Sequence, residues 1–172
     1  MARAWEVNGL SPDAGFRTAA GRIILTRWRE MMSSRDGTLT GGDIEDLHAM
    51  RVSSRRLRAA MDAFADVFPA SSFRRYLREV KGITDTLGDA RDLDVAIEHL
   101  TDLIPDLELL DRPGIEGLID RYEEQRRAED ARIRALFSRL DDEGYAEKFE
   151  AWVTKHTGIT VSRLRPAPPE AS

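Results

Sequence analysis

The chain has 172 residues, enough for one domain with a sizeable apolar core. Its net charge of -5 and pI near 5.3 argue against a protein that coats nucleic acid through general positive charge, so anion binding would have to be local. The absence of cysteine excludes disulfides, thiolate catalysis and Cys-ligated metals. No segment resembles a secretory signal or a membrane span of about 20 apolar residues, so we expect a cytoplasmic protein that does not enter a membrane.

Apolar residues recur at helical spacing along almost the whole chain, and no segment shows the alternation of a strand. Ser11-Pro12-Asp13 is a typical helix start, Pro69 is placed to end the second helix, and Gly88 is placed to end the third. A polar loop is expected over 33–42. The predicted helices cover about residues 12–34, 42–68, 71–87, 90–104, 113–141 and 142–157.

These elements predict an all-α protein, an antiparallel bundle of about five to six helices. We expect a single helical domain over residues 1–165 and a disordered, proline-rich tail over 166–172. The middle of the fifth predicted helix, 123–132, is nearly all polar. We therefore expect this stretch to project into solvent or to contact another chain.

The acidic chain concentrates positive charge in one short segment, which begins at His48 and ends at Arg58. On a helix, the histidine and three of its arginines lie within about one quadrant, beside an apolar stripe. The next predicted helix is also basic, and the short connection makes the two helices antiparallel neighbours. Between residues 48 and 91, nine Lys or Arg stand against five Asp or Glu. The pattern predicts a positive groove; a solvated surface with i,i+4 ion pairs is the alternative.

A second dense motif covers residues 87–95 and reads Leu-Gly-Asp-Ala-Arg-Asp-Leu-Asp-Val. Its local interpretation is a helix start, with Asp89 as the cap and Asp92 and Asp94 in the first turn, where negative charge is favourable. Arg91 gains nothing from that end of a helix, so it either pairs with an acid or faces a bound anion. The three aspartates are a weak metal site because alternate residues on a helix diverge. We expect no metal and no cofactor.

Together the two motifs resemble the CHAD family, whose name describes histidine-containing α-helical domains. The resemblance covers about residues 12–140 and is carried by His48-x-Met-Arg51-Val-x-x-Arg55-Arg56-Leu57-Arg58 and Leu87-Gly88-x-x-Arg91-Asp92-Leu93-Asp94-Val95. Members of that family are helical bundles that bind inorganic polyphosphate along a basic surface, often beside a triphosphatase-type domain or on polyphosphate granules. The resemblance implies an anion surface built from His48, Arg51, Arg55, Arg56, Arg58 and Arg91, and less tightly from Arg74, Arg75, Arg78 and Lys81.

The resemblance implies noncatalytic binding of inorganic polyphosphate, in the cytoplasm or on granules. A scaffold for another polyanion or an acidic protein is one alternative, and a metal-dependent phosphoanhydride hydrolase is the less favoured one, since no nucleophile and base pair and no phosphate-cradling glycine loop is present. Nucleic acid is not expected as a ligand. The aromatic residues of the basic helices have positions that place them on the core side, whereas single-stranded nucleic acid would favour aromatic residues on the charged surface.

One departure from the family concerns length. The family's usual domain has two similar helical halves, whereas the His-and-Arg helix occurs once in this chain, which resembles one half. We expect two chains to associate about a two-fold axis and so to form a homodimer that replaces the internal repeat. The alternative is a truncated domain, equivalent to one half, that functions without a second chain.

Two residues leave alternatives open. Arg27 lies on the inward side of the first predicted helix, where it either pairs inside the bundle or emerges at a groove. His48 could donate to phosphate when protonated, or could be a neutral histidine bonded at the core edge. We expect His99 and His156 to be structural or exposed.

Overall fold

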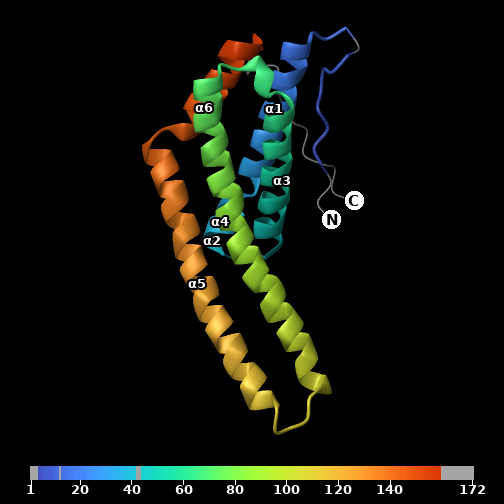
Figure 1. Cartoon of the computed structure of the whole chain (residues 1–172), viewed down its shortest axis with the longest axis vertical. Coiled ribbons are helices and arrows are strands. Elements are labelled where there is room, and N and C mark those ends of the chain that lie inside the picture. The colour runs from blue at the N-terminus through green and yellow to red at the C-terminus, as the bar shows by residue number, and fades with distance from the viewer. Residues whose placement is uncertain (1–3, 12, 42–43, 160–172) are drawn as a thin grey trace.

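The computed structural model describes residues 4–11, 13–41 and 44–159, and every regular element within them is a helix (Figure 1). The all-α prediction is confirmed. The α-helices are α1 (Phe16–Ser33), α2 (Arg35–Thr40), α3 (Ile44–Ala63), α4 (Ala70–Leu103), α5 (Arg112–Asp142) and α6 (Tyr145–Thr157). Two short 3-10 turns join them, η1 (Ala65–Val67) and η2 (Ile104–Asp106). No described helix is long and apolar enough to cross a membrane.

One apolar core holds the bundle together. Helix α1 packs between α3 and α6, while α4 packs between α3 and α5. Completely or almost completely buried side chains come from every long helix, for example Ile24, Met50, Leu57, Val80, Phe137 and Phe149. Burial of each such side chain stabilises the fold by about 1.5–3 kcal/mol. The core therefore fixes how α3 and α4, which carry the two sequence motifs, lie against each other.

An aromatic cluster closes the core at the start of α6. The rings of Tyr76 and Trp152 stack at 4.4 Å between centroids, and Trp28 lies 4.7 Å from Phe149. The hydroxyl of Tyr145 donates to the backbone oxygen of Tyr76 at 3.3 Å. These contacts join α1, α4 and α6 and hold the first half of α4 in place.

Helix α4 does not end at Gly88, so the prediction of two helices over 71–87 and 90–104 is wrong. The helix runs unbroken for 34 residues, which corresponds to about 51 Å. A glycine inside a helix costs only about 1 kcal/mol relative to alanine. Leu87 and Ala90, on either side of it, are fully buried, and their packing outweighs that cost. Asp89, Asp92 and Asp94 consequently lie inside a helix and do not cap one.

The end of α4 and the start of α5 extend beyond the other helices as a two-helix arm, which we define as residues 98–122 (Figure 1). Its apolar side chains are covered only in part. Leu103 is 38% exposed, and Leu109 and Leu110 at its tip are 78% and 91% exposed. The arm therefore has an accessible apolar surface that the described residues leave open.

Three boundaries also differ from the prediction. Helix α1 begins at Phe16 and not near residue 12. The expected loop over 33–42 contains α2, which is too short to show a hydrophobic period and is held by tertiary contacts. Arg35 forms an ion pair with Asp141 of α5 and lies 5.6 Å from the centre of the Phe137 ring. Helix α3 ends at Ala63, before η1 and Pro69. The predicted start at residue 42 and the tail over 166–172 lie outside the described residues.

Candidate functional site

Helix α3 presents its arginines beside a buried stripe. Leu47, Met50, Leu57 and Met61 face the core and are almost fully buried. Arg55 is exposed and has no ion pair among the described residues. Arg58 is 42% exposed and lies 4.0 Å from Asp62 on the next turn. An exposed pair at this distance contributes little free energy and does not fix the Arg58 side chain.

Arg51 reaches across to α4 and joins the two sequence motifs. Its Nη2 atom lies 3.7 Å from a carboxylate oxygen of Asp92. A Cβ atom at Gly88 would lie 4.0 Å from Arg51 Nε, which is ordinary van der Waals contact. Arg51 therefore passes over α4 between these two positions, and space alone does not demand glycine there.

The first half of α4 carries further cations on its outer side. Arg74, Arg75 and Arg78 are exposed, and Lys81 is half-buried. Arg75 lies over the Tyr76 ring at 4.9 Å, and none of the four has an ion pair within the described part of the chain. Because α3 and α4 are packed neighbours, we group these residues with those of α3 as the basic surface: Arg51, Arg55, Arg58, Arg74, Arg75, Arg78 and Lys81.

Arg56 points away from the basic surface, toward α1. Its Nη1 donates to the buried carboxylate of Glu30 at 2.8 Å. Arg27 pairs with the same carboxylate and donates to the backbone oxygen of Trp5 at 2.7 Å. The open question about Arg27 is therefore answered: it pairs inside the bundle. Arg56 completes that buried pair from the other side.

Arg91 also lies apart from the basic surface. It lines a cavity of about 250 Å³ between the start of α3 and the middle of α4, together with Glu45, Asp94 and Glu98. The surroundings of Arg91 are thus acidic. Within the described ranges, no group of three or more His, Asp or Glu side chains is arranged to hold a metal ion.

His48 is half-buried, and its Nδ1 atom is enclosed without a hydrogen-bond partner among the described residues. The bonded core-edge histidine considered from the sequence would need a partner at one of its ring nitrogens, and Nδ1 has none. A contact with a bound anion would have to come through Nε2. Three of the predicted site residues therefore fit an open anion surface less well than the others. They are His48, which is partly enclosed, Arg56, which binds Glu30, and Arg91, which lies among acids.

A buried ion pair that the sequence analysis missed locks the α4–α5 contact. Asp94 is 8% exposed, and its Oδ1 accepts a hydrogen bond of 2.6 Å from Arg126 Nε, while Asp130 pairs with the same guanidinium. Burial opposes the charge of Arg126, but its hydrogen bonds with Asp130 and Asp94 outweigh this and hold its pKa above the usual value. The signal was available, because Asp94 follows Leu87 and Ala90 on one helical stripe. The polar middle of α5 is thus partly turned inward.

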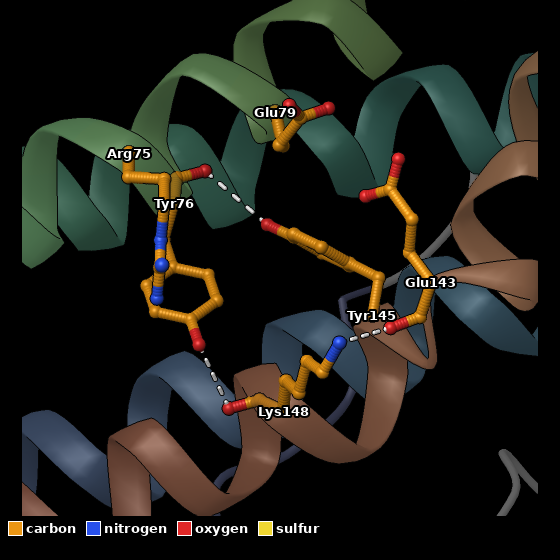
Figure 2. Close-up of a pocket in the computed structure, with 6 residues that line it drawn as sticks. All are labelled: Arg75, Tyr76, Glu79, Glu143, Tyr145 and Lys148. Atoms are coloured by element: carbon orange, nitrogen blue, oxygen red, sulfur yellow. Dashed lines mark hydrogen bonds between the residues drawn. The ribbon is translucent and has the colours of Figure 1, made fainter.

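A cavity of about 370 Å³ lies where α4 meets the turn between α5 and α6. Figure 2 shows the residues that line it. Its two carboxylates are already used, since Arg139 pairs with Glu79 at 2.7 Å and with Glu143 at 3.1 Å. Burial, with the nearby charge of Glu79, raises the pKa of Tyr145. The hydroxyls of Tyr76 and Tyr145 donate to the backbone oxygens of Lys148 and Tyr76, so the cavity lies where α4 is joined to α6. Arg75 lines the same cavity and is the cation that it shares with the basic surface.

Comparisons with known proteins agree with this architecture. The crystal structure of the CHAD domain from the plant Ricinus communis matches with a TM-score of 0.65 at 24% sequence identity, over 96% of this chain and 53% of that one. The chain thus spans about half the length of that structure. No curated protein matches the sequence. The model of the CHAD domain matches residues 22–171, most of the sequence, and the chain therefore belongs to the CHAD family.

Proposed function

We propose that this chain binds inorganic polyphosphate, without catalysis, along the basic surface of α3 and α4. The observation that carries the proposal is a group of cations without acidic partners. Arg55, Arg74, Arg78 and Lys81 have no ion pair among the described residues, whereas the buried arginines of the bundle, such as Arg27 and Arg126, are matched by carboxylates. A cation left uncompensated in an acidic protein is available to an external anion.

The spacing of these cations suits a linear polyanion. Residues three or four apart on a helix stand about 5–6 Å from each other, and Arg74, Arg78 and Lys81 follow this spacing along α4. Arginine adds bidentate hydrogen bonds to phosphate oxygens, and lysine adds a point charge. Membership of a family linked to polyphosphate supports the same ligand.

We further propose that the protein acts in the cytoplasm on or near polyphosphate granules. Co-localisation of a fluorescent fusion with stained granules would test this location.

A hydrolase would need carboxylates that are free to hold a metal beside the cations. Asp62 and Asp92 contact Arg58 and Arg51 singly, and within the described residues no three acids are grouped to hold a metal ion. This arrangement favours binding over metal-assisted hydrolysis. Magnesium-dependent release of orthophosphate from polyphosphate by the purified chain would contradict the noncatalytic part of the proposal.

The direct test is a titration with long-chain polyphosphate, short-chain polyphosphate, heparin and duplex DNA at two salt concentrations. Counterion release makes the logarithm of the binding constant fall linearly with the logarithm of salt concentration, so the slope reports the number of phosphates engaged. We expect polyphosphate to bind more tightly than heparin and DNA, with a slope that increases with chain length. Equal affinity for all four polyanions would contradict specific recognition.

A further inference from the structure

The exposed face of α4 changes the sign of its charge halfway along the helix. Residues at steps of three or four share this face. Its first half carries Arg74, Arg75, Arg78 and Lys81, and its second half carries Asp85, Asp89 and Asp92. At the boundary stands Gly82, where a Cβ atom would have no neighbour within 4 Å. The face is therefore basic, then open and without a side chain, then acidic.

A helix face with this order is complementary to its own antiparallel copy. We propose that a second copy of this chain lies antiparallel along the exposed face of α4, related by a two-fold axis close to Gly82. In the register that places Gly82 opposite Asp85 of the partner, Arg78 comes opposite Asp89. Arg74, which shares a helical line with Asp92 because five turns separate them, comes within one residue of the position opposite Asp92. The two-fold axis makes each of these pairs occur twice. Glycine at the crossing lets the two helices approach closely.

The acids of this face are only loosely engaged within their own chain. Asp89 lies 3.6 Å from Arg132, and Asp92 lies 3.7 Å from Arg51, in both cases with the carboxylate more than half exposed. Arg74 and Arg78 have no ion pair among the described residues. The charges needed for the intermolecular pairs are therefore available without breaking a buried contact.

The arm adds apolar area to the same contact. Helix α4 continues further from Gly82 toward Leu103 than toward Ala70, so each arm reaches the end of the partner bundle at which α4 begins. At that end Phe16 is 62% exposed and packs on Phe64 with 5.2 Å between ring centroids. Exposed apolar side chains such as Leu103 thus exist at both ends of the paired helices.

Exposed ion pairs contribute little each and are screened by salt. The complex is therefore weak and salt-sensitive. Under the proposed function, polyphosphate needs the arginines that the partner's aspartates cover, so ligand and second copy compete for one surface. The dimer itself does not depend on the proposed function.

The test is a charge swap read by light scattering at about 50 mM and about 500 mM salt, which lie on either side of the range in which surface pairs are screened. The wild-type chain should give twice its mass of 19.4 kDa at the lower salt and approach 19.4 kDa at the higher. Arg74→Glu with Arg78→Glu reverses the basic members of the intermolecular pairs. Asp89→Arg with Asp92→Arg reverses the acidic members, so that basic residues dominate the face.

Each swapped variant alone should dissociate about tenfold more readily or remain monomeric, because like charges then face each other across the axis. An equimolar mixture of the two variants should form a heterodimer, and the chain with all four changes should form a homodimer again. Glu124→Lys with Asp142→Lys on α5, two exposed acids outside the arm and without an ion pair in the described structure, is the control and should leave the dimer intact. Circular dichroism checks that every variant stays helical.

The variant with the basic face separates the two proposals. It should be monomeric on its own and still bind short-chain polyphosphate at least as tightly as the wild type. Loss of that binding would count against the proposed function and not against the dimer. A wild-type monomer at about 100 µM in low salt, masses that grow beyond two chains, or swapped variants that fail to recombine would overturn the inference.

Discussion

The guanidinium of Arg51 lies 3.7 Å from the carboxylate of Asp92, and this contact brings the two sequence motifs of the chain to one point between α3 and α4. The pair is loose and partly exposed, so its own contribution to stability is small. The contact shows where the basic residues of α3 lie against α4, close to the point at which the basic half of that helix meets its acidic half.

Reversal of two arginines on α3 should reduce polyphosphate binding without unfolding the chain. Arg55 and Arg58 lie off the buried stripe, so Arg55→Glu with Arg58→Glu should weaken affinity at least about tenfold and lower the salt slope. Arg121→Glu with Arg134→Glu, two exposed residues of α5, makes the same change in net charge away from the basic surface. Equal losses in both variants would show that only total charge matters.

Leu57 belongs to the core face of the same helix. It is fully buried, so Leu57→Ala should lower the free energy of unfolding by about 2–5 kcal/mol through lost burial and a residual cavity. Leu110→Ala at the exposed tip of the arm should change it by less than about 0.5 kcal/mol. Urea denaturation measures both. A small effect at Leu57 would contradict the orientation of α3.

Gly88 tests the continuity of α4. Because this glycine lies inside the helix with room for a Cβ atom, Gly88→Ala should raise the free energy of unfolding by about 0.5–1 kcal/mol. Gly158 has a φ of 70° at the end of α6, a left-handed conformation, and Gly158→Ala should destabilise the chain. Thermal denaturation of the two variants should therefore give shifts of opposite sign. A helix that ended at Gly88 would give two shifts of the same sign.

The buried pair between Asp94 and Arg126 should be costly to break from one side. Asp94→Ala should destabilise the chain by about 1–3 kcal/mol, since it leaves the Arg126 guanidinium with Asp130 alone. Asp94→Leu combined with Arg126→Met removes both charges and should recover most of that loss. A double-mutant cycle in urea gives the coupling. Additive losses would show that the two groups do not interact.

Tyr145 should make stability depend on alkaline pH. Burial raises the pKa of its hydroxyl in the folded chain, whereas in the unfolded chain tyrosine titrates near about 10. Above that pH only the unfolded state loses this proton, so the free energy of unfolding should fall by up to about 1.4 kcal/mol per pH unit; below it, Tyr145 adds no pH dependence. Tyr145→Phe should flatten the decline. An unchanged pH profile in that variant would contradict the buried, neutral hydroxyl.

Periodicity predicted the helical class, the buried stripe of α3 and most helix positions. The reason is that a helix with one buried face has apolar residues three or four positions apart in the sequence. Periodicity failed where tertiary contacts determine whether a helix continues or forms. Gly88 has the chemistry of a helix end, yet packing of Leu87 and Ala90 carries the helix through it. Helix α2 is too short for a period to show.

The candidate site shows a similar limit. A helical wheel places Arg55 and Arg56 on the outside of α3 but does not identify the neighbouring helix. The structure leaves Arg55 open and turns Arg56 toward Glu30 of α1. Arg91 likewise comes from the same motif as Asp92 and faces a more acidic environment. Which arginine is available to a ligand therefore depends on contacts between helices that are distant in sequence.

Because α4 is unbroken, it fixes the distance between charged residues along its length. Helices bend only gently unless a proline, a bulge or an inserted side chain interrupts them, and α4 contains no proline. Arg78 and Asp89 are therefore held at a rise of about 16 Å along one axis. A binding partner that touches both must present charges at that separation, and no rearrangement of loops can adjust the distance.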